Sequence, residues 1–285
     1  MRPTRALVCF FLLGASVCHA ASVCVNPGGT GGCLASIQQA VNTVAPRGRV
    51  DVAAGTYGES LSIPFGAQIQ IYGAGAALTV IDGTAGAPVV LMGSTEDAGS
   101  SLAISDLTLT GGSDGVHAYN GWLKRVRTTI SRCIISGNTG AGVATQGRLK
   151  MTDSSVRDNG GYGIGSSFGR AEIERSTISG NLGDGINCFA STCLILASTV
   201  SGNSGAGLAS VPTRVLVRAT TIAGNGVGLD IHDGYSALCS PPSSRTARQA
   251  PTSPQARRPF TTCLGATTSS RRSIPWRASI TPLPT

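Results

Sequence analysis

Two glutamates in the middle of the chain have the residue type and spacing that could cleave a bond between sugars. Such cleavage usually needs two carboxyl groups about 5–10 Å apart, one as acid and one as nucleophile or base. Glu172 and Glu174 flank Ile173 in an alternating stretch, so on a strand both point outward, about 6.6 Å apart along the chain. Lys150, expected beside Glu172 on the neighbouring strand, offers a simpler explanation, because cross-strand ion pairs and solvated charges are common on strand faces.

A second polar group, around Asp230 and His232, lies where the regular part of the chain ends. Histidine beside carboxylates can move protons or bind a metal near neutral pH. An exposed histidine is more often simply solvated, and His117 is expected about 24 Å from Asp230 along the fold. We therefore predict no metal and no cofactor. The candidate catalytic residues, with the catalytic role itself unknown, are Glu172, Glu174, Asp230 and His232.

The elements that must position these residues are indicated by a repeated phrase. "STISGNLGDGI" at 176–186 returns with small changes at 133–143, 154–164, 198–208 and 220–229. The asparagines of the five copies are 21, 22, 22 and 22 residues apart, and a fixed period of this size predicts a solenoid. The Leu-x-x-Leu-x-Leu skeleton of a leucine-rich repeat is absent, while short β-branched runs predict strands. The predicted fold class is all-β: a right-handed parallel β-helix solenoid of about eight coils of ~22 residues, stacked about 4.8 Å apart.

Each coil repeats its apolar positions in step with its asparagine. One inward column holds Ile135, Val156, Ile178, Val200 and Ile222. Asparagine tolerates the left-handed backbone of a tight corner, and its amide can bond to the asparagine of the next coil. We therefore predict a ladder that is structural and not catalytic. Its members are Asn138, Asn159, Asn181, Asn203 and Asn225.

The first coil is expected to begin with a cap. In "LASIQQAVNTVA" the residues Ile37, Ala40, Val41 and Val44 follow helical spacing, and Ser36 is a good N-cap. This pattern predicts a short N-terminal amphipathic helix that covers the open apolar end of the stack.

The N-terminal half also resembles a known superfamily. "SIQQAVNTVAPRGRVDVAAGTYGESLSI", followed by "IYGAGAALTVIDG", resembles the start of the pectin-lyase-like parallel β-helix superfamily, nearest to pectin methylesterases in its Gly-x-Tyr-x-Glu. The resemblance implies the fold, but the superfamily contains lyases, hydrolases, esterases, epimerases and proteins without activity. The short catalytic motifs of its methylesterases, polygalacturonases, pectate lyases and alginate epimerases are absent, as are calcium-binding Gly-Gly-x-Gly-x-Asp repeats.

Residues 1–20 have the pattern of a secretory signal peptide: two arginines, a short apolar run and small residues before the cleavage point. The run is too short to span a membrane, and no later segment is long enough. Seven cysteines remain after cleavage, which fits an oxidising, extracellular or periplasmic compartment. We predict local disulfides for Cys24 with Cys33 and for Cys188 with Cys193, and a buried thiol for Cys133.

The predicted organisation is a signal peptide over 1–20, a capped β-helix over 21–235 and a tail over 236–285. The tail is rich in Pro, Ser, Thr and Arg, and it lacks the Asn and Gly pattern of the coils. It is either a disordered basic segment that binds acidic polymers or a segment read in the wrong frame. Without signal peptide and tail the chain is close to neutral, so nothing in it argues for nucleic acid.

Two functions from different classes fit these observations. The first is an exported, non-catalytic module that binds a glycan or another protein. The second is a carbohydrate-active enzyme, a polysaccharide lyase or glycoside hydrolase, with an unrecognised site. The missing motifs and the lack of aromatic residues beside Glu172 favour the first. The expected partners are a polysaccharide or a surface protein, with no nucleic acid and no membrane span.

Overall fold

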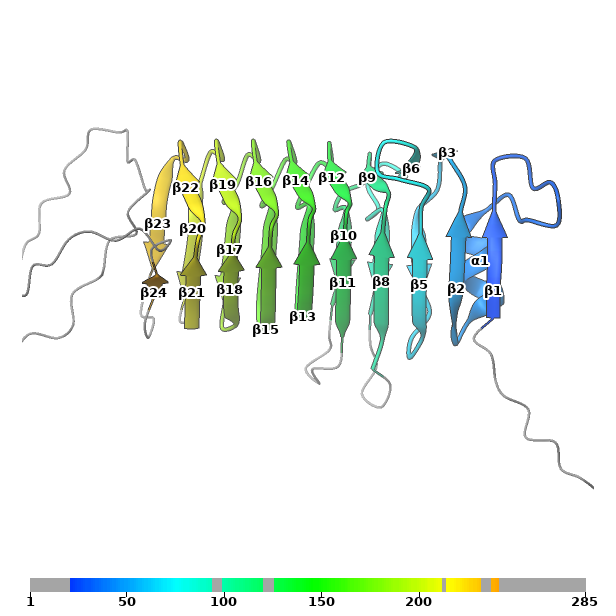
Figure 1. Cartoon of the computed structure of the whole chain (residues 1–285), viewed down its shortest axis with the longest axis horizontal. Helices are drawn as coiled ribbons and strands as arrows, with labels where there is room; N and C mark the ends of the chain where they lie inside the picture. The colour runs from blue at the N-terminus through cyan, green and yellow to red at the C-terminus, as the bar shows by residue number, and fades with distance from the viewer. Residues whose placement is uncertain (1–20, 94–98, 120–125, 212–213, 232–236, 241–285) are drawn as a thin grey trace, which may run out of the picture.

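The chain forms an elongated stack of parallel β-coils (Figure 1). The computed structural model describes residues 21–93, 99–119, 126–211, 214–231 and 237–240. The predicted signal peptide, His232 and the predicted tail from residue 241 on lie outside the described residues.

The larger of two sheets has sixteen strands and bends at a corner into two faces. Two long strands run through this corner and belong to both faces: β13 (Val143–Thr152) and β15 (Ile164–Glu174). Besides these two, the first face holds β4 (Leu61–Ile63), β7 (Val90–Met92), β10 (Val116–Ala118), β17 (Ile186–Phe189), β20 (Ala206–Val211) and β23 (Val227–Ile231). The second face holds β1 (Ala21–Val25), β2 (Arg47–Val52), β5 (Gln68–Tyr72), β8 (Ser101–Ser105), β11 (Arg127–Ser131), β18 (Thr192–Leu196), β21 (Arg214–Arg218) and β24 (Ala237–Ser240).

The smaller sheet has eight strands, one from each of eight coils. They are β3 (Gly55–Tyr57), β6 (Thr79–Asp82), β9 (Thr108–Thr110), β12 (Ile134–Ser136), β14 (Ser155–Arg157), β16 (Thr177–Ser179), β19 (Thr199–Ser201) and β22 (Thr221–Ala223). Each coil therefore contributes to the first face, the second face and the smaller sheet in turn, and the predicted fold class and coil length are confirmed.

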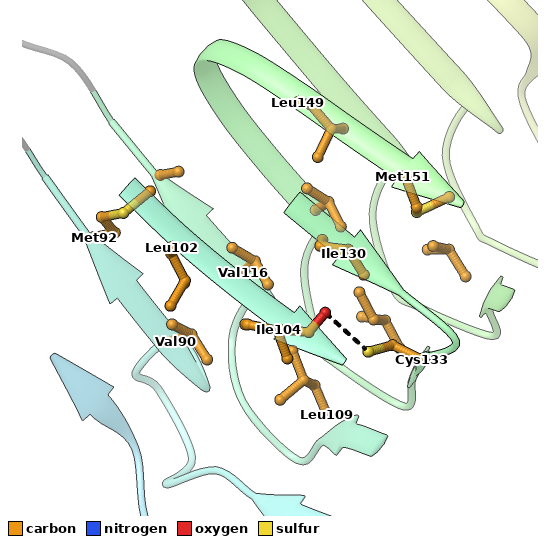
Figure 2. Close-up of a cluster of buried hydrophobic side chains, with 14 of the residues drawn as sticks. Val90, Met92, Leu102, Ile104, Leu109, Val116, Ile130, Cys133, Leu149 and Met151 are labelled. Atoms are coloured by element: carbon orange, nitrogen blue, oxygen red, sulfur yellow. Dashed lines mark hydrogen bonds between the residues drawn. The ribbon is translucent and has the colours of Figure 1, made fainter. Parts of the chain in front are cut away.

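The constant period builds the core, because each inward residue stacks on the same kind of residue in the next coil. The predicted column from Ile135 to Ile222 is in register along the smaller sheet and buried throughout. Inside the coil, Val116 of the first face, Ile104 of the second face and Leu109 of the smaller sheet point toward one another (Figure 2). Each such buried side chain stabilises the fold by about 1.5–3 kcal/mol relative to an exposed one.

The predicted cap is the helix α1 (Ile37–Val44), whose four apolar residues are all buried. The Ser36 hydroxyl accepts a hydrogen bond from the Gln39 amide, as expected for an N-cap. A second acceptor is Glu59, whose carboxylate accepts from the Ile37 amide at 2.7 Å and the Gln38 amide at 3.0 Å. The glutamate of the Gly-x-Tyr-x-Glu segment thus satisfies orphan amides and the positive end of the helix dipole.

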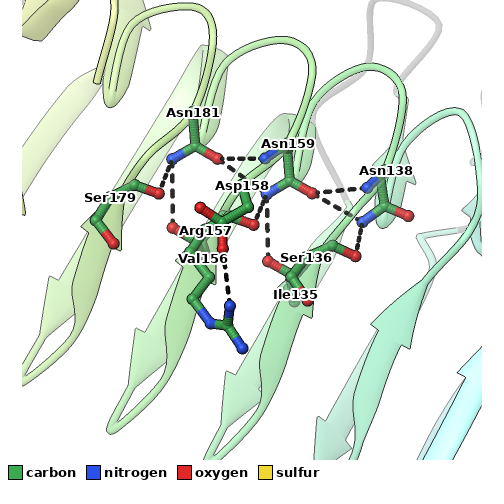
Figure 3. Close-up of polar contacts among 9 residues, drawn as sticks. All are labelled: Ile135, Ser136, Asn138, Val156, Arg157, Asp158, Asn159, Ser179 and Asn181. Atoms are coloured by element: carbon green, nitrogen blue, oxygen red, sulfur yellow. Dashed lines mark hydrogen bonds and ion pairs between the residues drawn. The ribbon is translucent and has the colours of Figure 1, made fainter. Parts of the chain in front are cut away.

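The asparagine ladder lies at the corner between the smaller sheet and the first face (Figure 3). The Asn159 side-chain amide and backbone amide both donate to Asn181 Oδ1, at 2.9 and 3.1 Å. The same two bonds join each neighbouring pair of ladder asparagines from Asn138 to Asn225. The expectation that the asparagines themselves take the left-handed backbone is wrong. The residue before each one does, as Gly180 does with a φ of 66°, because glycine makes this bend at little cost.

A second polar ladder, of hydroxyl groups, lies at the corner between the second face and the smaller sheet. The backbone amide of Ser154 donates to Ser176 Oγ, and that of Ser176 donates to Ser198 Oγ, both at 3.2 Å. The ladder continues to Thr220 and begins at Cys133.

The cysteines of the described residues form two disulfides, Cys24–Cys33 beside the cap helix and Cys188–Cys193 across one corner. Cys133 is a buried free thiol, and its burial raises its pKa to about 11. The thiol is therefore neutral and poorly nucleophilic near neutral pH.

The sheet extends beyond the predicted boundary at residue 235. Strand β24 pairs with β21 in parallel register, so at least residues 237–240 belong to the stack.

Candidate functional site

Glu172 and Glu174 lie at outward positions of β15 on the second face. Glu172 accepts hydrogen bonds from Arg170 at 2.6 Å and from Arg148 at 3.2 Å. Lys150 is in register with Glu172 as expected, but the two arginines are the residues that pair with it. Burial raises the pKa of the Glu172 carboxyl, yet both arginines outweigh burial and hold the pKa below its ordinary value. A glycosidase acid needs a raised pKa, so Glu172 is poorly suited to that role.

The other sequence candidates do not join Glu172. Glu174 forms an ion pair with Arg175. Asp230 is half-buried on β23, which belongs to the first face, and is in register with Ala209. The structure therefore separates Asp230 from the two glutamates, and His232 lies outside the described residues.

Aromatic side chains that the sequence analysis missed gather on the first face. We call them the aromatic group: Tyr119, Tyr162, Phe168 and Phe189, with exposed fractions of 36%, 46%, 54% and 43%. The Phe168 and Phe189 rings meet edge to face with their centroids 5.4 Å apart. The Tyr162 ring lies beside Gly165, on the same face. As expected, the outward positions beside Glu172 on β15, β18 and β21 carry no aromatic residue, although Tyr72 lies farther along the second face on β5.

Phe168 lies at the corner between the first and second faces. Strands β13 and β15 pair with an offset of 21 residues up to Gln146 and Ser167, and with an offset of 22 from Arg148 and Arg170 on, because β13 has one residue fewer at this corner. Phe168 has a φ of 54°, and Ala190, its equivalent in the next coil, has the same left-handed backbone with a φ of 46°. The one 21-residue spacing among the asparagines is the sequence signal of the shorter coil, but it does not show that Phe168 is exposed.

Two polar pairs accompany the aromatic group. His117 Nδ1 lies 2.7 Å from Asp114 Oδ2, and Asn187 Nδ2 donates to Asp184 Oδ2 at 2.9 Å. Each aspartate also accepts a backbone amide of the next coil. His117 and Asn187 share one outward column, three strand spacings or about 14 Å apart, with the short residues Ala144 and Gly165 between them.

The Asp114–His117 pair has the arrangement of an oriented base. Burial raises the pKa of Asp114, but the hydrogen bonds from His117 and the Ala141 amide outweigh burial and hold the pKa below its usual value. A carboxylate in this position favours a proton on Nδ1, the ring nitrogen that faces it. The Tyr119 ring lies 6.1 Å from the imidazole, centroid to centroid. The sequence analysis treated His117 as isolated because it compared His117 with Asp230 and not with the aspartate three residues before it.

A separate cavity of about 470 Å³ lies near the N-terminal end. Its lining includes Arg49, Asp51 and Tyr72, and the Arg49 guanidinium lies 4.2 Å from the centre of the Tyr72 ring.

Among the described residues, no three His, Cys, Asp or Glu side chains are grouped to hold a metal ion. No helix in this part of the chain is long and apolar enough to cross a membrane.

Stacked parallel coils, a helical cap at the N-terminal end and an asparagine ladder define a right-handed parallel β-helix. The family model described as "Right handed beta helix region" matches residues 92–239, and the chain belongs to this family. No curated protein matches the sequence.

Solved structures share this fold. The A-module of a mannuronan C-5 epimerase from Azotobacter vinelandii is 21% identical with a TM-score of 0.58, over 75% of this chain and 76% of that one. A pectin methylesterase from carrot is 12% identical with a TM-score of 0.49, over 76% and 82% of the two chains. A pectate lyase is 13% identical with a TM-score of 0.48, over 76% and 79%. At these identities the similarity concerns the fold alone.

Proposed function

We propose that this protein is an exported glycan-binding β-helix that holds a polysaccharide chain against the aromatic group on its first face. The observation that carries the proposal is the gathering of four exposed aromatic rings beside two hydrogen-bonding pairs on one face. Such rings give a sugar ring a flat apolar surface, and the adjoining polar groups can bond its hydroxyls.

Phe168 is a bulky apolar side chain that is 54% exposed, so it contributes to the surface at this corner and not to the core. Export is supported by the signal-peptide pattern and by the two disulfides. A polysaccharide ligand is also in keeping with the mannuronan epimerase that shares the fold.

The test is binding of the full-length protein to a panel of purified polysaccharides, neutral and acidic. Replacing both rings, Phe168→Ala with Phe189→Ala, should weaken binding about ten-fold, because each aromatic contact contributes roughly 0.5–1.5 kcal/mol. The matched control is Leu78→Ala, an apolar side chain that is equally exposed at 56% but lies before β6. Binding by the double variant that equals wild type, or no binding to any polysaccharide, would overturn the proposal.

A second function is favoured by the 2.7 Å contact between His117 and Asp114. In a polysaccharide lyase or glycoside hydrolase, His117 Nε2 would accept or donate the proton while Asp114 holds the ring. Release of unsaturated or reducing sugars that is lost in His117→Gln would establish this enzyme. Loss in Glu172→Gln or Asp230→Asn would instead place the reaction at the residues that the sequence predicted. A polymer that binds and releases no sugar would support the binding module.

A further inference from the structure

Three leucines occupy outward positions of the second face near its C-terminal end. Leu194 and Leu196 lie on β18, and Leu216 lies beside Leu194 on β21. All three are half-buried, and we call them the leucine patch. The only helix among the described residues, α1, lies at the opposite end of the stack and does not cover them (Figure 1).

The leucine patch interrupts a surface that is otherwise polar. In the same outward column as Leu194, the three preceding strands carry Thr129, Lys150 and Glu172. The change from polar to apolar side chains is therefore confined to the last coils. Adjoining apolar residues on a polar surface mark a place where another surface makes contact.

Charges of opposite sign lie on the two sides of the leucine patch. Strand β15 carries Glu172 and Glu174 on one side of β18, and β21 carries Arg214 and Arg218 on the other. Both arginines are exposed, and neither forms an ion pair with another described residue. An apolar centre with acid on one side and base on the other is complementary to itself after half a turn, which is the requirement for contact between identical chains.

We propose that the leucine patch is the contact between two copies of this chain, related by a two-fold axis that passes over β18 parallel to the strand. Half a turn about this axis places one leucine patch on the other and sets β15 of each copy opposite β21 of the second. Because the turn preserves the height along the strands, Glu174 faces Arg218 of the second copy, twice in each dimer. The same turn brings Arg214 near Arg170, whose charge Glu172 already offsets at 2.6 Å.

The size of the patch determines how strong this contact can be. Three strands of five residues cover about 14 Å by 17 Å, well below the roughly 800 Å² that each partner buries in a standard interface. We therefore expect a weak dimer, with a dissociation constant on the order of 100 µM. The contact lies on the second face and does not depend on the proposed function.

The experiment measures the molar mass of the full-length protein by sedimentation equilibrium at low ionic strength, from about 5 to 500 µM, and wild type should shift from monomer toward dimer. Arg218→Glu and Glu174→Arg should each weaken association about ten-fold, because each turns two attractive pairs into two repulsive ones. An equal mixture of the two variants should regain the wild-type affinity, since opposite charges then meet at both pairs. Arg157→Glu, which changes an exposed arginine of β14 on the smaller sheet, is the control and should associate like wild type.

Each other outcome counts against the proposal. Wild type that stays monomeric over the whole range overturns it, and so does a mixture that associates no better than its two components. An equal loss in Arg157→Glu would mean that total charge governs association, which also overturns it. The Phe168→Ala, Phe189→Ala variant should dimerise like wild type, so a failure of the aromatic site is not mistaken for a failure of this contact.

Discussion

The two polar corners of each coil make the same bend with different residues. At the asparagine corner the left-handed residue is glycine in four coils of five: Gly137, Gly180, Gly202, Gly224, with Asp158 as the fifth. At the hydroxyl corner it carries a side chain in every coil from the fourth strand of the second face on: Asp106, Arg132, Asp153, Arg175, Ala197, Ala219. The first corner therefore takes glycine with one exception, whereas the second carries a side chain in each of these coils.

Backbone conformation explains this preference better than space. A Cβ atom on Gly180 would lie 2.4 Å from an Asp158 carboxylate oxygen, but at Gly202 and Gly224 it would meet nothing nearer than 3.9 and 3.8 Å, and glycine is the residue that adopts the left-handed region at least cost. The open hydroxyl corner instead holds charge pairs between successive coils, Arg132 with Asp106 and Arg175 with Asp153. The asparagine corner is therefore without side chains in most coils, whereas the hydroxyl corner carries outward side chains that differ from coil to coil.

The largest expected effect belongs to a residue that joins the two corners. Ile178 lies on β16, between Ser176 and Asn181, and is fully buried. Ile178→Ala should lower the free energy of unfolding by roughly 2–5 kcal/mol, because it removes buried contacts and leaves a cavity. Urea unfolding measures it, with Leu182→Ala, 69% exposed, as the control that should change little. A variant as stable as wild type would contradict the coil register.

The asparagine corner should be the more sensitive of the two corners. Asn181 Oδ1 accepts two hydrogen bonds from Asn159, and its amide donates to Asn203 Oδ1. Asn181→Leu should cost roughly 1–3 kcal/mol, because it leaves buried polar groups of both neighbouring coils without partners. The same unfolding measurement applies, and a loss below that of the next variant would reverse the comparison.

The hydroxyl corner should lose less. Ser176 Oγ accepts one bond, from the Ser154 amide, and donates one, to the Glu174 carbonyl. Ser176→Ala should therefore cost about 0.5–1.5 kcal/mol, the usual net value of a hydrogen bond. A cost equal to that of Asn181→Leu would show that the two ladders stabilise the stack to the same extent.

The charge pairs at the hydroxyl corner should have the smallest effect, and a pH-dependent one. Hydrogen bonds from Arg132 lower the pKa of Asp106, and those from Arg175 lower the pKa of Asp153. Both pairs thus stabilise the fold fully above the unfolded aspartate pKa of about 3.9, and this contribution is lost as the pH falls through the lowered folded pKa. Asp106→Asn should be less stable than wild type at pH 6 and equally stable well below pH 3.9, measured by urea unfolding at low salt. A difference that persists in acid would mean that the ion pair is not its cause.

Period and alternation were enough to predict the architecture, because every inward residue of a solenoid meets its own equivalent in the next coil. The spacing of the asparagines predicted the coil length, and the helical spacing after Ser36 predicted α1. The role of Glu59 could not be predicted in the same way, since it contacts α1 from more than twenty residues away. The coils that contain β16, β19 and β22 keep the constant offset of 22 residues in their pairing, as their asparagine spacing predicted.

The binding surfaces were predicted less well, because they depend on departures from the period and on outward positions. Phe168 lies at a corner between two strand segments, where the alternating pattern does not say which way a side chain points. The total charge of the body conceals the line formed by Arg127, Arg148 and Arg170, because acidic residues elsewhere cancel their charge in the sum while the register places them side by side. The composition therefore gave no sign of these neighbouring arginines, which only the register between coils brings together.

The parallel register also has a consequence for how such a gene can change. Removing residues 176–197 would excise one whole coil and join Arg175 to Ser198, with both ladders still aligned. The same event would delete Phe189 and both partners of the Cys188–Cys193 disulfide, and it would bring Arg214 into register directly beside Arg170. A recombination between two repeats would thus remove an exposed aromatic residue and place Arg214 beside Arg170 in a single event. In this fold a whole coil can be gained or lost at once, and the outward residues can change while the core stays the same.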